Sequence, residues 1–104
     1  MDRQEREDER HKMFLELGII FKDGTYDLKG AVGAPIKDYR PTSNRSLTEL
    51  MLFHEWLVFY GMDSYRFSYD AIYKLFIKFS KGKYNRWSAR NIAKTYWRIT
   101  QVKP

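Results

Sequence analysis

The chain has 104 residues, of which 43% are hydrophobic and 17% aromatic, and its formal net charge is +6. This length suits one domain, and the apolar content is too high for a chain that is disordered throughout. Because there is no cysteine, the composition excludes disulfides, thiolate nucleophiles, cysteine-based zinc sites and iron–sulfur clusters.

The positive charge is concentrated in the C-terminal half. Residues 1–22 hold six acidic and five basic residues, residues 23–45 hold three and four, and residues 46–104 hold four and ten. From Ala71 onward there are nine Lys or Arg residues and no Asp or Glu. Such asymmetry indicates an anionic partner, most often a nucleic acid, with an acidic protein surface or an anionic membrane as less common choices.

The N-terminal part predicts a charged helix followed by a hairpin. Residues 2–17 repeat opposite charges at helical spacing, which stabilises an exposed helix. Asp23-Gly24 stands between two short runs rich in Ile, Phe, Thr and Tyr, and this pair favours a type I′ hairpin turn. We therefore expect a helix over 2–17, a two-stranded hairpin over 18–28 and a loop over 29–45, where glycines and prolines interrupt any periodicity.

The chain begins with twelve mostly charged residues, MDRQEREDERHK. A secretory signal would need an apolar segment there, and no apolar run approaches the roughly 20 residues of a membrane span. We expect a cytoplasmic protein with no membrane partner.

A first C-terminal helix is predicted from Ser46 to about Tyr60. Its start is indicated by Ser46-Leu-Thr-Glu49, a capping-box pattern in which serine and glutamate side chains satisfy free backbone amides. The helix is apolar nearly all round, which is typical of a central buried helix or of one that lends a side to an interface. Both interpretations stay open, the second being a protein partner or a homodimer through residues 47–60.

Two further helices are predicted, over residues 69–80 and from Asn85 or Ser88 to about Gln101. Ser68 suits the N-cap of the first of them. Both helices carry an apolar face opposite a row of cations.

The order of these helices resembles a tri-helical helix-turn-helix domain, in which the last helix enters the major groove and the one before it crosses the backbone. We expect a mostly α fold with a minor β component. Residues 1–45 would supply the N-terminal helix, hairpin and linker, and residues 46–104 a basic three-helix domain whose helix-turn-helix-like bundle spans about 46–101.

The last helix carries cations at every fourth position, which places them in one stripe. Like charges at this spacing repel each other and destabilise a helix, so the stripe points to an anion outside the chain. We predict that Arg90 and Asn91 reach base edges, because Arg pairs with guanine and Asn with adenine. Phosphate contacts are predicted for the remaining cations: Lys74, Lys78, Lys81, Lys83, Arg86, Lys94 and Arg98.

Two tryptophans, Trp87 and Trp97, have two interpretations. They either stack on exposed bases of a single strand, which would indicate single-stranded DNA or RNA, or pack within the protein.

Catalytic signals are weak. The two histidines, His11 and His54, lack the spacing of a metal pair, and there is no Gly-rich phosphate loop, nucleophile elbow or clustered carboxylate pair. We expect no enzymatic activity, no metal and no other cofactor.

Two functions therefore remain. The first is a small nucleic-acid-binding protein, with duplex DNA favoured over single strands or RNA, of helix-turn-helix type and acting in transcription or replication control. The second is an adaptor or inhibitor of the mobile-element type, which docks its basic and aromatic surface on a larger protein or nucleoprotein machine.

Overall fold

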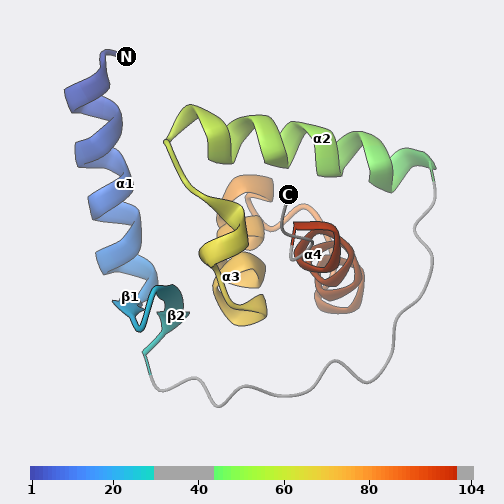
Figure 1. Cartoon of the computed structure of the whole chain (residues 1–104). Helices are drawn as coiled ribbons and strands as arrows, with labels where there is room; N and C mark the ends of the chain where they lie inside the picture. The colour runs from blue at the N-terminus through green and yellow to red at the C-terminus, as the bar shows by residue number, and fades with distance from the viewer. Residues whose placement is uncertain (30–43, 101–104) are drawn as a thin grey trace.

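The computed structural model describes residues 1–29 and 44–100. These residues form four α-helices, one 3-10 helix and a two-stranded hairpin (Figure 1). In chain order the elements are α1 (Arg3–Leu17), β1 (Ile19–Lys22), β2 (Thr25–Leu28), α2 (Asn44–Phe59), η1 (Ser64–Arg66), α3 (Tyr69–Ser80) and α4 (Arg86–Thr100). The predicted mostly helical fold with a small hairpin is confirmed, whereas most of the predicted loop over 29–45 lies outside the described residues.

Local sequence accounts for α1 and the hairpin. The Asp2 carboxylate accepts a hydrogen bond of 2.8 Å from the Glu5 amide at the start of α1, and Gly18 ends the helix with φ of 69°. Asp23 and Gly24 have φ of 53° and 82°, the positive values that a type I′ turn requires at both central residues. The predicted helix and hairpin are both confirmed.

Aromatic rings attach this N-terminal part to the helices that follow. Tyr26 of β2 stacks on Phe67 with ring centroids 4.7 Å apart, and Phe14 of α1 lies 5.3 and 5.9 Å from these two rings. The Ser68 amide donates to the Tyr26 carbonyl at 3.0 Å. The hairpin is therefore joined to the start of α3 by ring packing and by a backbone hydrogen bond.

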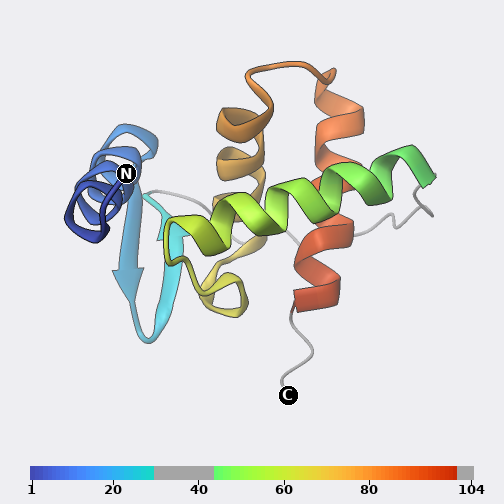
Figure 2. The ribbon, with the colours of Figure 1, turned by 90° about the horizontal axis from the view of Figure 1, so that it is seen from above.

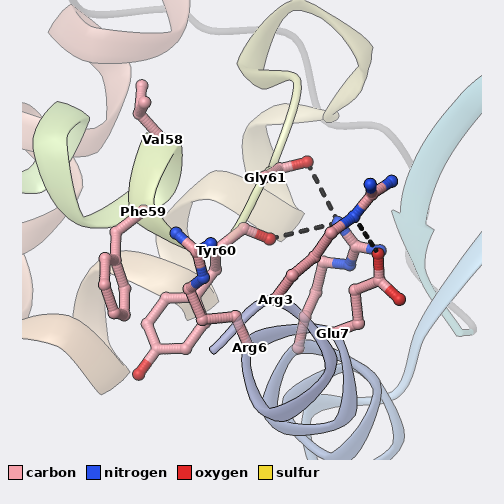
Figure 3. A pocket seen from close by; sticks show the side chains of 8 residues that line it. Arg3, Arg6, Glu7, Val58, Phe59, Tyr60 and Gly61 are labelled. Carbon is pink, nitrogen blue, oxygen red and sulfur yellow. Dashed lines mark hydrogen bonds and ion pairs between the residues drawn. The ribbon is translucent and has the colours of Figure 1, made fainter. Parts of the chain in front are cut away.

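A second attachment joins α1 to the end of α2 (Figure 3). The Arg10 guanidinium donates from Nη1 to the carbonyls of Tyr60 and Gly61, both at 3.1 Å. The C-terminal end of a helix carries partial negative charge, so a cation is favourable there. Gly61 has φ of +70°, and a Cβ at this position would lie 2.9 Å from the same nitrogen. Arg10 thus caps α2 from another helix.

We predict that Arg10→Met lowers the free energy of unfolding by about 1–2 kcal/mol, because two carbonyls lose a charged donor. Urea denaturation monitored by circular dichroism measures this change. Arg3→Met is the matched control on the same helix. Arg3 makes an exposed ion pair with Glu7, so its loss should cost less than about 0.5 kcal/mol. Equal losses for the two variants would contradict the capping role.

The start of α2 corrects one prediction. The helix begins at Asn44, so Ser46 is its third residue and not the N-cap. Glu49, the expected capping-box partner, has a side chain only 15% exposed, and its carboxylate pairs with the Lys83 ammonium at 3.2 Å. The capping box is a local signal, and here a contact with a distant lysine takes the carboxylate instead.

The core lies where α2 crosses α3 and α4 (Figure 1). Phe53 of α2 is fully buried, and its ring centroid lies 5.2 Å from that of Phe76, 5.4 Å from Phe79 and 4.9 Å from Tyr96. These rings belong to α3 and α4, so one side chain contacts both. Aromatic pairs at such distances add to the hydrophobic free energy of burial.

Helices α3 and α4 lie side by side and are joined at one end by a short turn (Figure 2). Ser68 caps α3 by accepting from the Ala71 amide at 3.2 Å, and Lys81 ends it in the left-handed conformation with φ of 54°. Asn85 caps α4 by accepting from the Ser88 amide at 2.8 Å. Asn85 and Ser88 were both predicted as possible N-caps of this helix, and Asn85 is the N-cap in the structure.

Candidate nucleic-acid interface

One side of α4 is buried and the opposite side faces outward. The buried side chains are Ala89, Ile92, Ala93, Thr95 and Tyr96. Helical spacing gathers most of the predicted contact residues on the far side. We call this side, with the adjoining Arg86, the basic face: Arg86, Trp87, Arg90, Asn91, Lys94 and Arg98. Asn91 and Lys94 are half-buried and the other four are exposed.

Tyr73 of α3 positions Arg90. The Arg90 guanidinium carbon lies 5.7 Å from the centre of the Tyr73 ring, a distance at which a cation is attracted to an aromatic face. Tyr69 lies one turn before, with its ring centroid 6.3 Å from that of Tyr73. Helical spacing places Tyr73 between the apolar and the cationic side of α3, and nothing in this spacing indicates a pairing with Arg90.

The hydroxyl of Tyr69 is buried and has no hydrogen-bond partner among the described residues. Burial raises the pKa of Tyr69 to about 12, although the positive charge of Arg90 acts in the opposite direction. Folding therefore favours the neutral phenol. The resulting stability is complete below the ordinary pKa of 10 and is lost as the pH rises towards 12.

We predict that Tyr69→Phe leaves the free energy of unfolding unchanged at neutral pH or raises it by up to about 1 kcal/mol, because a buried hydroxyl without a partner opposes folding. The variant should also lose less stability than the parent between about pH 9 and pH 11. Urea denaturation at the two pH values checks both effects. A loss of about 1 kcal/mol or more at neutral pH would show that the hydroxyl is hydrogen-bonded.

The lysines of α3 and of the following turn fall into two kinds. Lys78 pairs with Glu16 of α1 at 3.1 Å, and Lys83 pairs with Glu49 of α2 at 3.2 Å. Lys74 and Lys81 are exposed, and within the described ranges no carboxylate pairs with either. The lysines that were predicted to contact phosphates are therefore not equivalent. The spacing within α3 could not reveal this difference, because the carboxylates that pair with two of them lie 62 and 34 residues away in the chain.

The two tryptophans differ in environment. Trp97 is half-buried and packs against the hydrophobic core. Trp87 is 58% exposed and lies one helical turn before Arg90. Trp87 is therefore the better placed of the two to meet a base or a sugar of a bound nucleic acid.

Outside the basic face, the polar groups of the residues that the structure describes do not form a second candidate site. His54 Nδ1 lies 2.9 Å from the Tyr96 hydroxyl oxygen. Residues 1–29 and 44–100 contain no group of three or more His, Cys, Asp or Glu side chains arranged to hold a metal ion. None of their helices combines the length and apolar character needed to span a membrane.

In comparisons with protein families, curated proteins and solved structures, no match to this chain was found.

Proposed function

We propose that this chain is a small, non-enzymatic nucleic-acid-binding protein that places α4 in the major groove of duplex DNA. In this proposal α2, α3 and α4 act as a helix-turn-helix unit in transcription or replication control. The main support for this proposal is the basic face of α4. The sequence from Ala71 onward, to which this face belongs, contains no Asp or Glu. Like charges at helical spacing destabilise the free helix, and phosphates would relieve that repulsion.

The dimensions and residue types of α4 support this role. Its 15 residues span about 22 Å, and the major groove is about 12 Å wide, enough for one helix. Arg90 and Asn91 lie in the N-terminal half of the helix, where recognition helices contact base edges. Arg90 is held against Tyr73, which reduces the side-chain entropy lost on binding. Lys74 and Lys81 would contact phosphates beside the groove.

We predict salt-dependent binding to duplex DNA, to which Lys74 contributes more than Lys78. With about five phosphates contacted, the log of the affinity should fall against the log of the salt concentration with a slope of about −4 to −5. Lys74→Ala should make that slope shallower by about 0.9. Lys78→Ala, one turn along the same helix, should change it less, because Lys78 already pairs with Glu16.

The measurement is a fluorescence-anisotropy titration of labelled duplex DNA, single-stranded DNA and RNA at several salt concentrations. Tight binding to single strands alone would contradict the groove-binding geometry and would favour stacking on Trp87. A flat salt response for all three nucleic acids would refute the proposal.

The recognition of DNA sequence through base contacts needs a separate test. Arg90→Ala should reduce the preference between duplexes of different sequence, because it removes a bidentate base contact worth about 1–3 kcal/mol. Lys94→Ala should weaken all duplexes alike, because a phosphate contact carries no sequence information. Binding to a panel of duplexes by both variants distinguishes these outcomes. If Arg90→Ala weakened every duplex equally, Arg90 would be a phosphate contact.

A second candidate function, an adaptor or inhibitor that docks on a larger protein, is favoured by one observation. Trp87 is exposed between two arginines, Arg86 and Arg90, and Trp and Arg are enriched among the residues that dominate protein interfaces. Binding to an acidic protein surface that persists after nuclease treatment, together with no affinity for any nucleic acid, would favour this candidate.

A further inference from the structure

Helix α2 exposes apolar side chains on the side that faces away from the core. Six large apolar residues of α2 and the end of α4 are at least 43% exposed. We call them the α2 face: Leu47, Met51, Leu52, Val58, Phe59 and Ile99. Helical spacing places Ile99 with the buried residues of α4, yet it is 59% exposed because nothing among the described residues covers the last turn on that side. Monomeric proteins rarely leave contiguous apolar patches of this kind uncovered.

The α2 face is continuous with a groove between α2 and the end of α4. The groove has a volume of about 520 Å³, and its apolar lining includes Leu47, Met51 and Ile99. His54 and Glu55 lie along the same part of α2. A groove of this size accepts large side chains from a packed helix.

Charge separates this surface from the basic face. Residues 46–65 contain three acidic residues and no Lys or Arg. Two of these acids have cationic neighbours: Glu49 pairs with Lys83, and Asp63 lies 3.9 Å from Arg66.

At the C-terminal end of this surface, α1 brings cations close: the Arg6 guanidinium carbon lies 5.3 Å from the centre of the Phe59 ring, and Arg3 lines a pocket together with Val58. Residues 47–55 contribute no Lys or Arg, so two copies of a chain with a net charge of +6 repel each other least along that part of α2.

The spacing along α2 matches that of a helix which pairs with a copy of itself. Leu47, Met51, His54 and Val58 follow at intervals of four, three and four, which is the spacing of a coiled-coil seam. All four are exposed. We call these four residues the seam. Among the described residues, no second helix packs on it.

We propose that this seam pairs α2 with α2 of a second copy in a parallel, two-fold symmetric dimer. In a parallel pair, each seam residue faces the same residue of the second copy. The interval of three from Met51 to His54 makes His54 a d position, and a d residue also contacts the residue that follows the partner's d position. His54 would therefore lie beside the partner's Glu55, twice by symmetry. His54 Nδ1 already bonds with the Tyr96 hydroxyl, which leaves Nε2 for the carboxylate. An antiparallel pair would instead place the two Glu55 carboxylates on the same flank.

The absence of cysteine in the sequence allows a direct test. Sedimentation of the full chain should show a dimer that dissociates on dilution. Met51→Cys should form a disulfide-linked dimer under mild oxidation, because seam positions face each other in a parallel pair. Leu52→Cys is the matched control: this neighbouring residue is also exposed but lies about 100° further round the helix, and should cross-link far less.

A second variant separates dimerisation from folding. Met51→Glu should make the chain monomeric while leaving its circular dichroism unchanged, because Met51 is 67% exposed. A monomer at all concentrations would overturn the proposal, as would equal cross-linking at positions 51 and 52 or a dimer that Met51→Glu does not dissociate. These results do not depend on the proposed nucleic-acid binding.

Discussion

The packing of Phe53 between α3 and α4 is the contact on which the remaining arrangement depends. Its ring meets Phe76 and Phe79 on one helix and Tyr96 on the other, so α2 holds the two basic helices side by side. The end of α2 in turn receives Arg10 from α1. Aromatic burial therefore holds α2, α3 and α4 together at this crossing.

Because aromatic rings form the core between these helices, the positive charge lies on the outside of the molecule. Carboxylates from α1 and α2 reach only Lys78 and Lys83 among the lysines of α3 and the following turn. On α4, Arg90 is held by an aromatic ring and not by an acid, which keeps its full charge and limits its motion. The helices thus combine an apolar core with a cationic surface, and this combination suits a partner that supplies negative charge.

Much of this arrangement could be predicted from the sequence, because the signals are local. The Asp23-Gly24 turn and the apolar faces of α3 and α4 each depend on residues within a few positions of one another. The errors and omissions arise from contacts between distant segments. Glu49 meets Lys83 instead of capping α2, and Lys78 meets Glu16, because α1 and α2 pack where no spacing rule could place them. Tyr73 beneath Arg90 was missed for the same reason.

We propose that the outward side of α4 binds a nucleic acid. Backbone amide chemical shifts, followed by nuclear magnetic resonance while duplex DNA is added at low salt, would locate the residues that contact the DNA. The largest changes should cluster at Arg86, Trp87, Arg90 and Lys94, with smaller changes at Lys74 and Lys81. Changes confined to α1 or to the apolar side of α2, or no changes at all, would contradict it.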